Sequence, residues 1–160
     1  MKARLSKPIA GQNDMTGLER ALDAAAQIDK PLMVHIGNTH HPLEEILHRL
    51  RPGDIVTHSF HGIQRGIIAD NGRVLAGAVE ARDRGVIFDV GHGRGAFSFD
   101  VAEKALADGF PPGTVSSDVH RYNVRGPVYD LATTLSKYLL MGLSLDEVIS
   151  LGTERPAQAI

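Results

Sequence analysis

The chain has 160 residues, of which 42% are hydrophobic and 22% charged, a composition typical of one globular domain with its own core. Its net charge of −2 argues against partners that need a cationic surface, such as nucleic acid or an anionic membrane. The absence of cysteine excludes disulfides and thiolate metal sites, so any metal ion must bind His, Asp, Glu or a modified side chain. It also fits a reducing compartment, so we expect a cytoplasmic protein.

Strand-like and helix-like segments alternate along the chain. Strands are expected at residues 2–6, 32–35, 55–58, 86–90 and 114–118, and helices at residues 16–28, 42–50, 74–84, 98–108, 127–141 and 145–151. The last of these helices opens with a capping box, Ser144 followed three residues later by Glu147. This alternation predicts an α/β fold with a parallel sheet and right-handed crossovers.

Two architectures fit this rhythm. Five strand–helix units could form a small doubly wound sheet, which would bind a nucleotide and have helices on both faces. They could also form part of a (β/α)8 barrel, but a full barrel needs about 250 residues. A barrel of this length would therefore contain about five of the eight units.

Three polar residues stand at the predicted strand ends: His35, His58 and Asp118. If the strands are parallel, all three emerge at one rim, where neutral imidazoles and a carboxylate could bind a divalent cation such as zinc. Asp118 could then accept a proton from a water molecule activated by the metal. The alternatives are hydrogen-bonded structural histidines and a carboxylate that caps a helix. His120 could orient Asp118, contact substrate, or lie free in solvent.

A glycine-rich loop, GHGRG at residues 91–95, follows the fourth predicted strand. Its spacing is G-x-G-x-G rather than G-x-G-x-x-G, and no acidic strand end follows about 20 residues later, which argues against dinucleotide binding. We expect a flexible rim of an active site, with His92 or Arg94 near the substrate. His61, in the loop after the His58 strand, is a further candidate substrate neighbour.

Seven motifs together resemble one known family. They are MKARLS, MVHIGN, VTHSFHG, FDVGHGRGAFSF, VSSDVH, YDLATTLSK and TERPAQAI, in matching order over essentially the whole chain. The sequence resembles the amidohydrolase superfamily of metallohydrolases, and within it the dihydroorotase-like amidohydrolase/deacetylase branch.

The resemblance implies a (β/α)8 TIM barrel, of which this chain carries strands four to eight with their helices. It implies a site with two divalent metals, commonly Zn²⁺. Lys2 matches the fourth-strand lysine whose carboxylated amine bridges both metals. His35 and His58 match the ligands from strands five and six. Asp118 matches the eighth-strand aspartate that binds one metal and shuttles the proton.

One part of the family pattern has no counterpart here, the first-strand His-x-His pair that holds the more buried metal. We therefore expect residues 1–160 to form a single, incomplete barrel domain. The chain would be a truncated product or fragment, or its barrel would be completed by another chain. An open barrel leaves free sheet edges and an exposed inner face, which favour association with a second copy or a complementing chain.

The expected function is metal-dependent hydrolysis of amide or ester bonds in small N- or O-acylated carboxylates, as in a deacetylase. The partner would be a small molecule whose carboxylate could be held by Arg4, His92 or Arg94. Two alternatives remain: hydrolysis of a cyclic amide, as in a dihydroorotase, and a catalytically silent barrel fragment.

Overall fold

A computed structural model describes residues 1–160. Its centre is a parallel four-stranded sheet in which the spatial order of the strands follows the order in sequence. The strands are β1 (Lys2–Arg4), β2 (Met33–His35), β3 (Ile55–Thr57) and β4 (Ile87–Phe88). A parallel bridge between Asp89 and Thr114 adds a fifth segment beside β4.

Eight helices accompany the sheet. They are α1 (Lys7–Ala10), α2 (Asp14–Gln27), α3 (Leu43–Arg49), α4 (Ala76–Asp83), α5 (Phe99–Ala107), α6 (Leu131–Leu140), α7 (Leu145–Gly152) and α8 (Glu154–Gln158). The predicted capping box of α7 is confirmed, since Ser144 and Glu147 each bind the other's backbone amide. The short helices α1 and α8 were not among the predicted helices.

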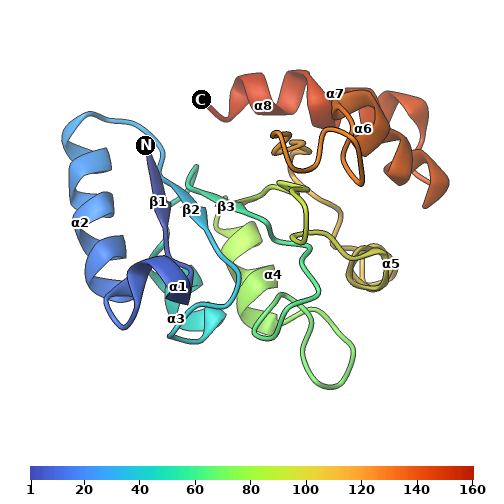
Figure 1. Cartoon of the computed structure of the whole chain (residues 1–160). Helices are drawn as coiled ribbons and strands as arrows, with labels where there is room; N and C mark the ends of the chain where they lie inside the picture. Colours follow the sequence, from blue (N-terminus) through green and yellow to red (C-terminus); the bar gives the residue numbers. More distant parts are fainter.

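The strand order decides between the two predicted architectures. A doubly wound sheet reverses direction at a switch point, whereas these strands advance in one direction without reversal. Right-handed crossovers in one direction place every crossover helix on the same face of the sheet. Figure 1 shows this progression around an arc, from α2 in blue through α4 in green to α6, α7 and α8 in orange to red. The prediction of a partial (β/α)8 barrel is confirmed, and the doubly wound alternative is wrong.

The two faces of the sheet carry different residues. Val34, Val56 and Phe88 are in register on adjacent strands and are buried in the hydrophobic core. On the opposite, inner face a polar row crosses the sheet at one level, formed by Arg4, His35, Thr57, Asp89 and Thr114. Side chains alternate along a strand, so residues next to the buried Val34, Val56 and Phe88 face the other way, onto the inner face. The row lies at the carboxyl ends of the strands.

All five predicted strands are shorter than expected, and two of them are shortened most. The segment 86–90 contributes only β4 and the Asp89 bridge, and the segment 114–118 contributes only the Thr114 bridge. The latter still follows its neighbour, because the amides of Val90 and His92 donate to the carbonyls of Thr114 and Ser116 at 3.1 and 3.0 Å. The amide of Val115 donates to Leu151 O, so on its other side the segment is tied to α7 rather than to a further strand.

The predicted helix at residues 127–141 starts later than expected. Residues 127–130 are not helical, and α6 begins after Asp130, whose carboxylate accepts a 2.6 Å hydrogen bond from the Thr133 amide. An aspartate at this position satisfies one of the free amides of the first turn and so fixes the helix start.

Candidate active site at the carboxyl ends of the strands

His58 directly follows β3 and is 2% exposed. Its φ of 67° lies in the left-handed region, so the side chain does not continue the alternation of the strand. Its Nδ1 lies 2.5 Å from Gly91 O, and because a carbonyl only accepts, Nδ1 carries the proton. The lone pair of Nε2 is therefore available, and this buried atom has no hydrogen-bond partner. A metal-binding histidine has this arrangement.

His35, the last residue of β2, lies beside His58, and the two ring centroids are 4.0 Å apart in an edge-to-face arrangement. Burial lowers the pKa of His35 to about 3, with further lowering by His58, Arg4 and Lys2. Burial also lowers the pKa of His58, although Gly91 O and Asp118 act in the opposite direction. Both imidazoles are thus neutral near pH 7, the form that binds a metal ion.

Lys2 and Asp118 belong to the first and the last segment of the sheet, on opposite sides of this histidine pair. The charge of Lys2 lowers the pKa of both His35 and His58, and the charge of Asp118 raises that of His58. Lys2 is exposed and in register with Met33, two residues before His35 along the sheet. Arg4 is level with His35, and its Nε donates to Ser6 Oγ at 3.1 Å. The four predicted ligands thus share one electrostatic neighbourhood, and their roles stay predictions.

Asp118 has a φ of 46°, so it is a second predicted site residue held in the left-handed region. Such backbone persists where the surroundings impose it, often at functional sites. The surroundings here include Asn123, which is fully buried, donates to Asp118 O at 2.9 Å and accepts from the His120 amide at 2.7 Å. His120 itself is exposed and faces Tyr122. Its side chain therefore fits the solvent alternative, and orientation of Asp118 falls to Asn123.

The glycine-rich loop contacts both His58 and Asp118. Gly91 binds His58 through its carbonyl, and Gly93 packs so closely on Asp118 that an added Cβ would lie 2.9 Å from Oδ2. His92 is buried, its Nδ1 bonds to Gly93 O, and its Nε2 is 2.5 Å from Lys137 Nζ on α6. Both ring nitrogens of His92 therefore already have partners within the protein. Arg94 is exposed in the same loop.

His61 is 1% exposed and completes the histidine cluster. The Ile63 amide donates to its Nδ1 at 3.1 Å, so its proton is on Nε2, a buried donor without a partner. Burial and the neighbouring His58 lower its pKa, which keeps the ring neutral. The loop around His61 lines a hollow of about 420 Å³, which also involves Arg65 and Asp100. A free N–H beside such a hollow could donate to a ligand.

The candidate side chains have the chemical types that bind a divalent cation. The free Nε2 of His58, the neutral His35 and the carboxylate of Asp118 are nitrogen and oxygen donors of the type that zinc prefers. No group of three His, Asp or Glu side chains lies close enough to hold an ion as the chain stands. The fit therefore rests on donor chemistry and on the orphaned Nε2.

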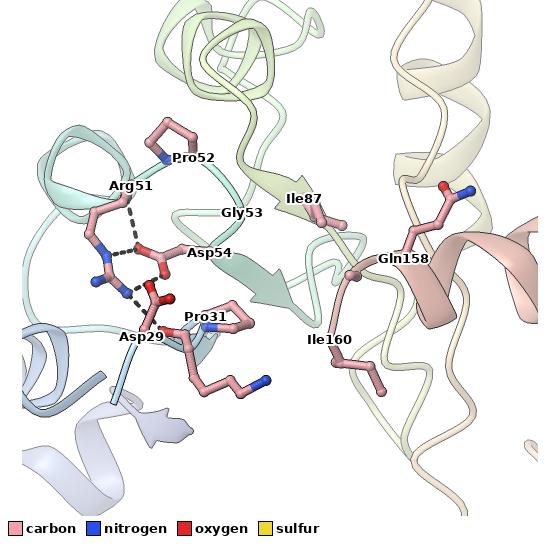
Figure 2. Close-up of a pocket in the computed structure, with 11 residues that line it drawn as sticks. Asp29, Pro31, Arg51, Pro52, Gly53, Asp54, Ile87, Gln158 and Ile160 are labelled. Carbon is pink, nitrogen blue, oxygen red and sulfur yellow. Dashed lines mark hydrogen bonds and ion pairs between the residues drawn. The ribbon is translucent and has the colours of Figure 1, made fainter. Parts of the chain in front are cut away.

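A second hollow, of about 370 Å³, lies at the opposite end of the sheet and contains none of the predicted site residues. Figure 2 shows that on one side of this hollow the guanidinium of Arg51 forks over Asp54, across from Gln158 and Ile160. Asp54 precedes β3 and also accepts from the Leu32 amide at 2.8 Å. Asp54 and His58 thus mark the two ends of one strand, and the bonds of Asp54 are structural.

Histidines and an aspartate at the carboxyl ends of parallel barrel strands stand where barrel enzymes have their active sites. Comparisons with known proteins agree. The chain is 40% identical over 161 residues to a deacetylase of Enterococcus faecalis, covering 99% of this chain and 44% of that protein. It is 36% identical over 160 residues to the deacetylase Atu3266 of Agrobacterium fabrum, covering 100% of this chain and 39% of that protein. No protein-family model matches the sequence.

Two solved structures match over 99% of the chain. One, described as an adenine deaminase, has a TM-score of 0.94 at 40% identity, and the other, described as a dihydroorotase, has a TM-score of 0.93 at 36% identity. The chain covers 44% and 43% of these structures, and less than half the length of the curated relatives. The resemblance to the dihydroorotase-like deacetylase branch of the amidohydrolase superfamily is confirmed.

Three residues at the site were not predicted from the sequence: Asp89, Asn123 and Lys137. Lys137 and Asn123 act through partners that the sequence does not reveal, such as His92, 45 positions before Lys137. Asp89 did leave a signal, because it interrupts the apolar run VIFDV. A carboxylate in a buried strand needs partners, which predicts a polar network around it.

Proposed function

We propose that this chain forms part of the active site of a metal-dependent hydrolase that cleaves amide or ester bonds in small N- or O-acylated carboxylates. The observation that carries the proposal is the buried, unpartnered Nε2 of His58, whose other ring nitrogen is fixed by Gly91 O. Related proteins named deacetylases support the choice of acyl substrates. The supporting comparisons cover less than half of those proteins, so the activity of the whole enzyme is part of the proposal.

His35, His58 and Asp118 would hold the ion, and a carboxylated Lys2 would add oxygen ligands. Zn²⁺ suits this mixture of nitrogen and oxygen donors. When bound, a divalent cation supplies the Lewis acidity that polarises the acyl carbonyl and makes water nucleophilic near neutral pH. In the intact enzyme we propose two such ions, the second needing ligands that this chain lacks.

Asp118 would act on the proton. Its carboxylate would accept the proton of the attacking water and return it to the leaving amine or alkoxide. The left-handed backbone at Asp118 and its anchor at Asn123 support this role, because a proton carrier must be held within hydrogen-bond reach of both groups. Exposed Arg4 and Arg94 are the cations available for the substrate carboxylate, whereas His92 would support the loop.

The test is zinc analysis of the purified chain together with hydrolysis of an N-acetyl amino acid. We expect bound zinc and measurable turnover, with a loss of at least about 100-fold in turnover in Asp118→Asn. The control is Asp23→Asn, which removes an exposed carboxylate from α2 and should leave both readings unchanged. A wild-type chain that binds no zinc and turns over no substrate would contradict the proposal and favour the silent fragment.

Cyclic amide hydrolysis is the second candidate, supported by the structural neighbour described as a dihydroorotase. The bond cleaved is again an amide, so the same residues would act. Parallel assays with dihydroorotate and an N-acetyl amino acid distinguish the two by their relative turnover.

The location and the partner chain are also proposals. A cytoplasmic location is supported by the absence of cysteine. None of the helices combines the length and apolar character that crossing a bilayer requires. Association with a second copy or a complementing chain is supported by a hollow of about 320 Å³ on the inner face, lined by Met33, Ile55 and Leu131 among others. A molar mass that rises with protein concentration would support it, and a constant monomer mass would contradict it.

A further inference from the structure

Asp89 is a buried carboxylate, 2% exposed, in the polar row on the inner face of the sheet. Three hydroxyl groups donate to it. Thr57 Oγ1 and Ser116 Oγ lie 2.6 and 2.7 Å from Oδ2, and Thr114 Oγ1 lies 2.9 Å from Oδ1. Hydrogen bonds to a charged acceptor are shorter and stronger than neutral ones, and the two bonds to Oδ2 have such short distances.

The three donors belong to the two segments that carry the candidate site. Thr57 immediately precedes His58, and Ser116 is two residues before Asp118. The backbone of Asp89 makes two further hydrogen bonds, one before His58 in the sequence and one after it. Its amide donates to Val56 O at 2.8 Å, and its carbonyl accepts from the Ser59 amide at 3.1 Å. Asp89 thus binds residues on both sides of His58 in the sequence and, through Ser116, the segment that leads to Asp118.

The same short segment continues this contact. Gly91 O fixes the tautomer of His58, and the amide of Gly93 donates to Ser117 O at 3.1 Å. The side chain of Asp89 is the part of this segment that links both predicted ligand positions at once, because its Oδ2 is shared by Thr57 and Ser116.

We propose that Asp89 is a positioning residue that fixes the backbone segments carrying His58 and Asp118, the two predicted metal ligands nearest to it. This inference deepens the proposed function and rests on it for the roles of His58 and Asp118. Asp89 itself contacts neither the ion nor the substrate. It acts through Thr57 and Ser116, as the outer hydrogen-bond partners of metal ligands do.

The test compares Asp89→Ala with a matched control at the other end of β3. Asp54→Ala also removes a buried carboxylate with several hydrogen bonds, but its partners Leu32 and Arg51 lie away from the candidate site. We expect the dissociation constant for zinc to rise about 10- to 100-fold in Asp89→Ala, the usual effect of losing such a partner. Asp54→Ala should lower stability and leave zinc affinity unchanged.

A second readout needs no metal. In a ¹⁵N spectrum of the imidazoles, His58 of the wild-type chain and of Asp54→Ala should show one tautomer, with Nδ1 protonated. In Asp89→Ala the signal should average between tautomers. If the wild-type chain binds no zinc, the proposed function fails, and the His58 spectrum alone decides the role of Asp89.

Milder variants guard against misfolding of Asp89→Ala. Asp89→Asn keeps the size and most bonds but loses the charge, so its zinc affinity should lie between wild type and Asp89→Ala. Thr57→Val removes one hydroxyl and should weaken zinc binding, whereas Thr57→Ser should restore it. Zinc affinity and a His58 spectrum in Asp89→Asn and Thr57→Val that match those of wild type would overturn the inference.

Discussion

Gly91 offers the sharpest test of how the loop supports the candidate site. Its φ is 50°, and a Cβ built there would overlap Thr57 Oγ1 and lie 2.9 Å from His58 Nδ1 and 3.0 Å from His58 N. Gly91→Ala therefore combines two costs. Left-handed backbone at a residue with a Cβ costs about 1–2 kcal/mol. Forcing a methyl group into a packed site costs about 1–3 kcal/mol more.

We expect Gly91→Ala to lower the free energy of unfolding by about 2–5 kcal/mol. For a chain of this length, each kcal/mol corresponds to a fall of about 2–4 °C in Tm. The measurement is thermal and urea unfolding followed by circular dichroism. The matched control is Gly109→Ala, where φ is 69° and an added Cβ meets nothing within 4 Å, so only the backbone cost applies.

The difference between the two glycine variants isolates the steric term. If Gly91→Ala is no more destabilising than Gly109→Ala, the close approach of Gly91 to Thr57 and His58 does not exist in solution. The bond from His58 Nδ1 to Gly91 O, on which the free Nε2 depends, would then also be in doubt.

Two further predictions concern buried polar groups outside the site. The hydroxyl of Tyr138 is buried without a partner, and burial, together with the charge of Asp89, raises its pKa. Because an unpaired buried group costs about 1–3 kcal/mol, Tyr138→Phe should not lower Tm in thermal unfolding. A fall in Tm would show that the hydroxyl is bonded. Burial opposes ionisation of Asp14, but hydrogen bonds from the His41 amide and ring outweigh it and lower the pKa of Asp14 below 3.8. The contribution of the Asp14 carboxylate to stability is therefore complete above pH 3.8 and is lost as the pH falls through its lower pKa in the folded state. In urea unfolding, Asp14→Asn should therefore lower the free energy of unfolding more at pH 7 than at pH 2. An equal loss at both pH values would contradict this.

The sequence was a good guide where local patterns decide the structure. The apolar runs before His35 and His58 predicted β2 and β3, and the capping box predicted the start of α7. Each of these signals is contained in fewer than ten residues. The parallel rhythm then placed the two histidines at one rim, and their rings are indeed in contact.

The sequence was a poor guide where partners distant in the chain decide. The segment 114–118 has a strand-like composition, yet the amide of Val115 bonds to Leu151 rather than to another strand. The left-handed conformations of His58 and Asp118 are also set by tertiary contacts, because residues with a Cβ do not adopt them by preference. No local pattern could have predicted them.

The polar row explains why the site was only partly visible from the sequence. The sequence shows the residues that would contact a metal ion, because they follow strands and have characteristic side chains. The residues that hold them, Asp89 and Gly91, look like the end of a strand and the start of a flexible loop. Yet Gly91 selects the nitrogen of His58 that stays free, and Asp89 joins Thr57 to Ser116. A ligand pattern therefore identifies the kind of chemistry, whereas the geometry that allows it depends on bonds between segments about 30 residues apart.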